Sequence, residues 1–168
     1  YLAVHEGRLW GLDAWDGSAR YPHRAVYSRI SPAGPNAHYD QFDGSAFAQA
    51  ADARVGEPTG LVSWMGNLYA IFEYGISVLS SDPAPGRLSA FSMVVSGRGA
   101  TSPRSIVASP IGIFMNSAEG PILFDGGPNP RLISARISSV IADSLNATNH
   151  VSAFHPLRQD YVRATANG

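Results

Sequence analysis

The acidic side chains in the first half of the chain are its candidates for acid–base chemistry. They include Asp13, Asp16, Asp40, Asp43 and Glu73. Two carboxylates on either side of a sugar bond would be the acid and the base of a glycosidase. The aspartates, however, stand beside glycine or in turn-like segments, where an Asp side chain hydrogen-bonds its own backbone. We therefore interpret them as turn residues.

The histidines are candidate metal ligands, but their spacing does not favour a metal site. None stands in a His-x-x-x-His or similar pattern with a carboxylate. The segment Asp40-x-x-Asp43-Gly44 has a faint likeness to a calcium loop, but it lacks the other oxygen ligands and the final Glu. We predict no metal ligand among the five histidines, which are His5, His23, His38, His150 and His155.

Candidate nucleophiles and phosphate-binding loops are also weak. The chain has no Cys, which excludes thiolate catalysis and disulfides. Ser109 and Ser117 are not in a nucleophile elbow. Gly97-x-Gly99 is followed by Arg104 but lacks the P-loop pattern and its lysine, so a glycine-rich connector is the better interpretation. We predict no catalytic, cofactor-binding or metal-binding residue, no cofactor and no enzymatic activity.

The composition indicates a well-buried chain or a part of an assembly. Only 15% of the 168 residues are charged, against a typical value of about 25%. The net charge of −1 gives no electrostatic reason to expect nucleic acid or an anionic membrane as a partner. No apolar run reaches the roughly 18 residues of a membrane helix. Because the chain begins and ends close to strand-like runs, we expect it to be an excerpt of a longer polypeptide.

The elements that would position these residues follow a repeated strand pattern. Gly66 and Gly112 are 46 positions apart, and Gly75 and Gly120 are 45 apart, each inside a similar apolar run. An earlier copy at Gly7 lies 59 positions before Gly66. Repeats of about 40–50 residues built from short strands are typical of β-propeller blades. One blade cannot bury both of its faces, so such a repeat predicts a ring of blades.

The pattern predicts an all-β fold of β-propeller blades with one short interblade helix. We expect blade-like units at about 1–58, 59–103, 104–148 and, in part, 149–168. Residues 31–58 are expected to be an irregular excursion, and 134–145 a short amphipathic helix with Ile137, Val140 and Ile141 turned inward. His5 should lie at the edge of a turn near Glu6-Gly7. The predicted strands are two in 1–15, then 23–30, 61–64, 67–73, 76–80, 88–96, 105–109, 112–116, 121–125, 151–154 and 159–164.

Aromatic residues within these strand runs allow two interpretations. They could stack on sugars at an exposed face, or fill the space between neighbouring sheets, and the second use is the commoner one. We favour core packing for Trp10, Trp15, Tyr69, Phe72, Phe114 and Phe124.

Two stretches resemble the blades of β-propeller structural proteins in tailed bacteriophages. One is the strand pair within 60–79, and the other runs from Arg104 through Gly112-Ile113-Phe114-Met115 to Ser134. The resemblance covers most of residues 1–165 except 31–58. It implies a tail or neck part of the nozzle or hub type, located in the virion tail. Its implied partners are other copies of itself and other tail or head–tail connector proteins.

The favoured function is therefore structural, with recognition through residues 31–58 and the connecting loops. Two alternatives remain. A glycan-binding propeller would show an exposed aromatic platform, and a propeller glycoside hydrolase would show a sheltered pocket with two facing carboxylates.

Overall fold

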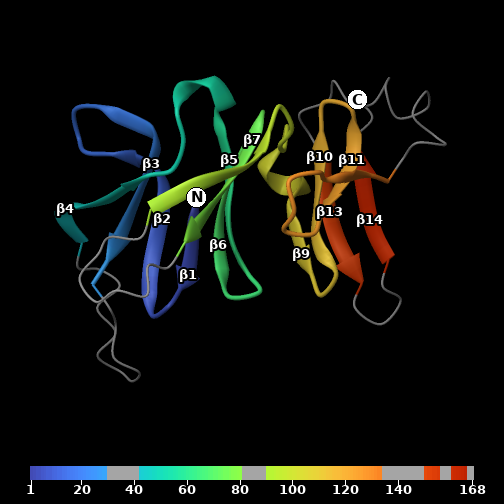
Figure 1. The fold of residues 1–168 in the computed structure, drawn as a ribbon, viewed down its shortest axis with the longest axis horizontal. Coiled ribbons are helices and arrows are strands. Elements are labelled where there is room, and N and C mark those ends of the chain that lie inside the picture. The colour runs from blue at the N-terminus through green and yellow to red at the C-terminus, as the bar shows by residue number, and fades with distance from the viewer. Residues whose placement is uncertain (30–41, 81–89, 134–149, 156–159, 166–168) are drawn as a thin grey trace.

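The protein is an all-β chain of small antiparallel sheets, as predicted from its strand pattern (Figure 1). The computed structural model describes residues 1–29, 42–80, 90–133, 150–155 and 160–165. Sheet A has the strand order β1-β2-β3-β4, and sheet B the order β5-β6-β7-β8. Sheet C has the order β12-β11-β10-β9, and sheet D pairs β13 with β14. Every strand in sheets A, B and C pairs with its neighbour in the chain, so each sheet is a simple meander.

The strand bounds agree with most of the predicted ranges. Sheet A contains β1 (Leu2–His5), β2 (Arg8–Trp15), β3 (Arg20–Ser28) and β4 (Phe42–Gln49). Sheet B contains β5 (Pro58–Trp64), β6 (Asn67–Phe72), β7 (Gly75–Ser80) and β8 (Ala90–Ser96). Sheet C contains β9 (Val107–Ser109), β10 (Gly112–Ser117), β11 (Gly120–Phe124) and β12 (Arg131–Leu132), and sheet D contains β13 (His150–His155) and β14 (Asp160–Thr165).

One expectation about these elements is wrong and another lies outside the description. Residues 42–49, expected to be irregular, form β4 and pair with β3. A backbone hydrogen-bond partner on β3 outweighs the weak strand pattern of this segment, because strand formation depends strongly on context. The helix expected at 134–145 lies outside the described residues. In the described part, the helical elements are two 3₁₀ turns, Ala53–Val55 and Pro103–Ser105. None of its helices is long and apolar enough to cross a membrane.

Tight turns fix the register of the first hairpin in each sheet. Glu6-Gly7 joins β1 to β2, and Met65-Gly66 joins β5 to β6. All four of these residues have positive φ angles, from 48° to 75°, which is the backbone of a type I′ turn. In sheet C, the side chain of Ser109 closes the turn instead, by accepting from the Ile111 amide and donating to the Gly112 carbonyl.

This register gives the three sheets matching positions. Arg8, Asn67 and Gly112 each begin a second strand directly after a two-residue turn. Trp10, Tyr69 and Phe114 are therefore the third residues of their strands, and all three are buried. Gly75 and Gly120 likewise begin the third strands of sheets B and C.

The three sheets lie in a row, and their facing sides are apolar (Figure 1). We call the side of a sheet that looks toward the next sheet in the chain its front face, and the opposite side its back face. Trp10 and Leu12, on the front of sheet A, share a core cluster with Leu68 and Phe72, on the back of sheet B. The front of sheet B and the back of sheet C share a second cluster, which includes Tyr69, Ile71, Ile113, Met115 and Phe124.

Polar and aromatic contacts strengthen these two interfaces. His23 of β3 stacks on Phe72 with 5.6 Å between ring centroids, and Trp64 Nε1 donates to the Ser109 carbonyl at 2.7 Å. Tyr69 meets Phe124 edge-on at 5.2 Å. Full burial of each large apolar side chain contributes roughly 1.5–3 kcal/mol, so the stacking of sheets dominates the stability of this fold.

Candidate interaction surface

The back face of sheet A is the candidate functional surface. Its residues occupy the positions that sheets B and C use to pack on the preceding sheet. Leu2 pairs with Gly11 across β1 and β2, as Leu61 pairs with Ala70 across β5 and β6. Leu2 and Leu61 are therefore matching residues.

The two matching leucines differ sharply in exposure. Leu61 is 7% exposed beneath sheet A, whereas Leu2 is 70% exposed. Val4, on the same side of β1, is 54% exposed. At the neighbouring position Gly11 stands where sheet B has Ala70 and sheet C has Met115, and both of those are fully buried. A sheet face built like an internal one thus lies open to solvent.

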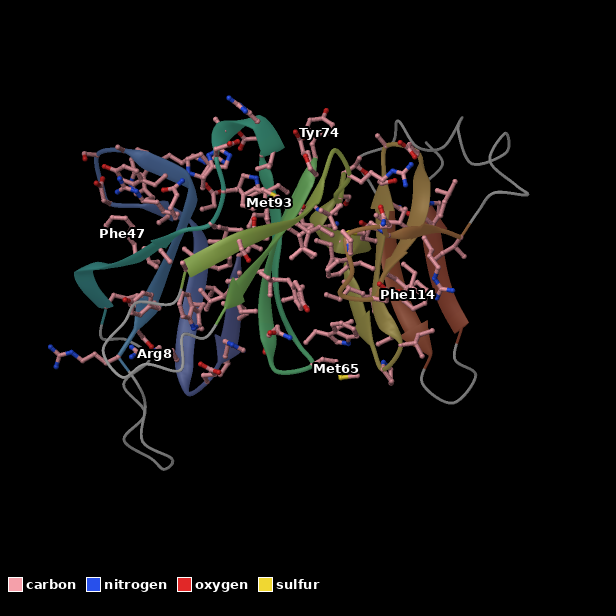
Figure 2. All side chains as sticks on the ribbon, viewed as in Figure 1. Arg8, Phe47, Met65, Tyr74, Met93 and Phe114 are labelled. Carbon is pink, nitrogen blue, oxygen red and sulfur yellow. The ribbon has the colours of Figure 1, made fainter. Side chains whose placement is uncertain are left out.

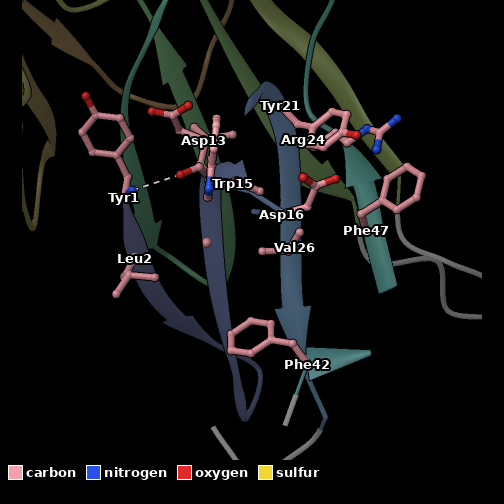
Figure 3. Close-up of a pocket in the computed structure, with 13 residues that line it drawn as sticks. Tyr1, Leu2, Asp13, Trp15, Asp16, Tyr21, Arg24, Val26, Phe42 and Phe47 are labelled. Carbon is pink, nitrogen blue, oxygen red and sulfur yellow. Dashed lines mark hydrogen bonds between the residues drawn. The ribbon is translucent and has the colours of Figure 1, made fainter. Parts of the chain in front are cut away.

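A hollow of about 450 Å³ lies on this face (Figure 3). Its walls come from all four strands of sheet A, with Leu2 on β1, Trp15 on β2, Val26 on β3, and Phe42 and Phe47 on β4. Gly11 adds no side chain to its floor. A Cβ placed there would lie 3.4 Å from the side chains of Leu2 and Val26. The absence of that side chain deepens the middle of the face.

An arginine and two aromatic rings form one wall of the hollow. The Arg24 guanidinium carbon lies 4.2 Å from the Tyr21 ring centroid and 4.5 Å from that of Phe47. Cation–π contacts of this kind hold a guanidinium flat over an apolar surface. Figure 2 shows Phe47 at the sheet A end of the molecule, whereas Met65 and Tyr74 lie in turns at opposite ends of sheet B.

The carboxylates near the hollow are held in place by other groups. Asp13 accepts from Arg20 Nε at 2.6 Å and from a terminal guanidinium nitrogen at 3.0 Å, and Arg20 also contacts Glu57 at 2.7 Å. Asp13 therefore belongs to an ion-pair network at a bulge in β2, not to a turn of its own as expected. Asp16 does close its own turn, as expected, by accepting from the Ser18 and Ala19 amides at 2.8 Å.

The Asp16 carboxyl is poorly suited to proton donation. Hydrogen bonds from the amides of Ala19 and Ser18, together with the Ser18 hydroxyl, lower its pKa well below the usual value for Asp. A glycosidase acid needs a raised pKa, which burial in an apolar pocket provides. Asp16 is exposed, so it stays ionised near neutral pH. Of the other acidic residues considered, Asp40 and the side chain of Asp43 lie outside the description, and Glu73 accepts from the Glu57 amide.

The described histidines have structural contacts. His5 ends β1 before the turn, as expected, but it is buried, and its Nδ1 lies 3.0 Å from the Ser63 hydroxyl. His23 Nε2 lies 2.9 Å from the Gly56 carbonyl oxygen. His150 and His155 are the first and last residues of β13, and their side chains lie outside the described part of the chain. His38 lies outside the described residues altogether. Within the described part of the chain, no three His, Cys, Asp or Glu side chains gather in a way that could hold a metal ion.

The serines and glycines considered as chemistry are turn and packing residues. Ser117 repeats the turn geometry of Ser109, accepting from the Glu119 amide and donating to the Gly120 carbonyl. Gly99 packs so closely on the β6–β7 turn that a Cβ there would overlap the Phe72 carbonyl oxygen. The next amide, that of Ala100, donates to the same oxygen at 3.0 Å. This amide is engaged by the protein and is not presented to a phosphate.

The aromatic residues divide between core and surface. Tyr69, Phe72 and Phe124 lie between sheets, as expected, and so does Trp10. Trp15 is the exception, because it is 66% exposed at the rim of the hollow. The sequence did not reveal this surface group, which also includes Tyr21, Arg24, Phe42 and Phe47. Alternation along a strand identifies two faces, but not which of them lacks a neighbouring sheet.

Comparison with models of known protein families gives no match for this chain. No curated protein matches it either. Its function must therefore be inferred from the sheets, their exposed faces and the resemblance described above.

Proposed function

We propose that this chain is a structural component of a bacteriophage tail, built as part of a β-propeller that docks other virion proteins. The observation that carries the proposal is the constant direction of stacking. The front of sheet A packs on the back of sheet B, and the front of sheet B packs on the back of sheet C. Four-stranded meanders stacked in one direction are the construction of propeller blades.

The matching positions support the same proposal. Trp10, Tyr69 and Phe114 are large aromatic residues at one register position in three successive sheets. A large ring at a fixed point on each front face is the kind of contact that a repeated interface between blades would use. A constant rotation from each sheet to the next would curve the row into a ring when further blades complete it.

The location in a virion tail is supported by the resemblance of particular segments. Residues 60–79 and 104–134 resemble the blades of phage tail proteins, and 60–79 lies within the first three strands of sheet B. The strands of sheet C lie within 104–134. A tail part works through area and shape, and the open apolar back of sheet A offers both. Its partners would be other copies of the chain and neighbouring tail or connector proteins.

Cross-linking of intact phage particles whose genome encodes this chain tests the proposal. The chain contains no lysine, so carboxylate-reactive cross-linkers are the suitable reagents. We expect links from Asp and Glu residues to other tail proteins, at a fixed stoichiometry per particle. Absence of the chain from purified particles would refute the structural role.

The hollow on sheet A favours glycan binding as a second candidate function. Exposed Trp15 and the ring of Phe47 provide the apolar surface on which a sugar could stack, with Arg24 beside them. Titration of host-surface polysaccharide into the wild-type protein and into Trp15→Ala would separate the two functions. Saturable binding that Trp15→Ala abolishes would favour glycan recognition.

A further inference from the structure

The outer edge of sheet B lacks a strand partner within the described residues. β8 pairs with β7 along one side, and no other backbone partner of this strand occurs in the described part of the chain. Its seven residues include no charged side chain and no proline. A row of unpaired backbone amides and carbonyls on such a strand is a template for one more strand.

The outer edges of the other two four-stranded sheets are better protected. β12 of sheet C has only two residues, and its exposed Arg131 directly follows Pro130. β4 of sheet A contains Asp43 and has a register shift against β3. Short strands, charges, prolines and bulges are the devices by which proteins prevent unwanted pairing at a sheet edge. β8 has one such device, a bulge at Val94, but its register with β7 is regular over the stretch from Ala90 to Met93.

A groove of about 520 Å³ lies beside this regular stretch, between β4 and β8. Ala90, Phe91 and Met93 of β8 contribute to one wall, and the small side chains of Ala48 and Ala50 lie on the opposite wall. Met93, labelled in Figure 2, is 43% exposed. The free backbone edge and an apolar groove therefore run along the same four residues.

The groove is the open margin of an interface that already exists within the chain. Ala48 and Ala50 belong to the core cluster between sheets A and B, and Phe91 packs against that cluster. An apolar side chain that entered the groove would extend this cluster outward. Because alternate residues of a strand point to the same face, a strand on the β8 edge could place such side chains there.

We propose that an extended, uncharged segment of a partner protein pairs with the stretch from Ala90 to Met93, as a fifth strand of sheet B, and inserts apolar side chains into the groove. The occupant is a strand because the donors and acceptors of a strand edge are matched by those of another strand. Main-chain hydrogen bonds would supply the affinity, and the groove would select the side chains. This inference rests on the docking role in the proposed function and names the kind of segment that is docked.

The first experiment selects random peptides for binding to the immobilised wild-type chain. We expect the enriched peptides to share an uncharged stretch in which apolar residues alternate, and Ala90→Lys should abolish their enrichment. Ala90 is exposed at the groove, where a lysine on the edge strand should oppose pairing. Ser96→Lys is the matched control, because Ser96 is exposed on the same strand beyond the bulge and does not line the groove.

A synthetic copy of an enriched peptide then measures the size of the effect. Its affinity should fall at least about tenfold in Ala90→Lys and stay unchanged in Ser96→Lys. Both variants should keep the wild-type melting temperature, because both positions are exposed. Equal binding of the peptide to Ala90→Lys and to the wild-type chain would overturn the proposal, and so would a library that yields no enriched peptide.

Amide hydrogen exchange locates the bound peptide. Adding it should slow exchange in the stretch from Ala90 to Met93, and protection confined to another strand would overturn the site. Exchange is also measured without peptide at rising protein concentration, with light scattering in parallel. A dimer that protects β8 and is abolished by Ala90→Lys would assign this edge to a second copy of the chain and overturn the partner segment.

The failure of this inference can be told apart from the failure of the proposed function. A chain that is cross-linked to tail proteins in particles, but whose β8 edge binds no peptide, would keep the structural role and overturn the added strand. A chain that is absent from particles, but binds peptides along β8, would support the added strand and refute the tail location.

Discussion

Substitution of the matching residues Leu61 and Leu2 by alanine should have very different costs. The two leucines occupy the same register position in sheets B and A, but Leu61 is 7% exposed and Leu2 is 70% exposed. The chemical change is identical, so any difference in the free energy of unfolding reports the neighbouring sheet. Leu61 packs in the cluster between sheets A and B, whereas Leu2 faces the open hollow.

The magnitudes follow from burial. Leu→Ala in a packed core costs 2–5 kcal/mol, and we expect about 3 kcal/mol for Leu61→Ala because the sheets on both sides hold the cavity open. Leu2 is about 30% buried, and full burial of Leu is worth about 2 kcal/mol, so Leu2→Ala should cost about 0.6 kcal/mol. The difference of about 2 kcal/mol is roughly a 30-fold change in the unfolding equilibrium.

Urea unfolding followed by tryptophan fluorescence provides the measurement. Trp10 is buried between sheets A and B, and Trp64 packs against the cluster between sheets B and C, so the emission changes when the sheets separate, over a background from exposed Trp15. The protein should be kept at a concentration where light scattering shows a monomer, so that association between copies does not change the exposure of Leu2. Equal losses for the two variants, or a loss below about 1 kcal/mol for Leu61→Ala, would refute the stacking argument.

Three further outcomes are expected. Gly99→Ala should lower the free energy of unfolding by about 3 kcal/mol or more, because the new Cβ would overlap backbone atoms of the β6–β7 turn. Gly127→Ala is the control, because its Cβ would meet only the Asp125 carboxylate, at 3.3 Å, and it should change the melting temperature little. Trp64→Phe should cost about 1 kcal/mol in urea unfolding, because it removes the 2.7 Å bond to the Ser109 carbonyl that joins sheets B and C. In NMR titration the pKa of the Asp16 carboxyl should lie below the usual range for Asp. Its contribution to the free energy of unfolding should be complete above the ordinary Asp pKa and disappear as the pH falls through the lowered pKa. A titration midpoint at or above the usual range would contradict this.

The strands could be predicted from sequence where turn chemistry and apolar alternation agree. The predicted strand 67–73 and the observed β6 (Asn67–Phe72) differ by one residue, because the positive-φ turn at Met65-Gly66 fixes where the strand begins. β4 could not be predicted, since Gly44, Ser45 and Ala46 have weak strand preference. Its pairing with β3 is a tertiary effect that no local pattern records.

The roles of small residues were also hidden in the sequence. Ser109 and Ser117 each close a hairpin turn through the same pair of hydrogen bonds. In both turns the Ser stands three residues before a Gly, as Ser109 does before Gly112 and Ser117 before Gly120. The pattern Ser-x-x-Gly between two apolar runs is therefore a usable sequence signal for such a turn. The close contact of Gly99 with Phe72 joins segments far apart in the chain, and spacing alone could not reveal it.

The candidate surface shows why function was harder to predict than fold. Leu2 and Leu61 stand in similar local sequences and on the same side of similar hairpins, so their sequence patterns imply the same burial. Their exposures differ because sheet A covers Leu61 on the back of sheet B, whereas no sheet in the described residues covers Leu2 on the back of sheet A. The information lies in the position of a sheet within the stack, which is a property of topology.

The same reasoning suggests where the chain has most freedom to acquire a partner. A residue on an internal face, such as Met115, must fit the neighbouring sheet within the limits of core packing. A matching residue at the end of the row, such as Gly11, is free of that constraint within the described chain. Gly11 removes a side chain at the centre of the open face, and Trp15 and Phe47 place rings at its margin. Together these residues line a hollow of about 450 Å³ on the open face of sheet A.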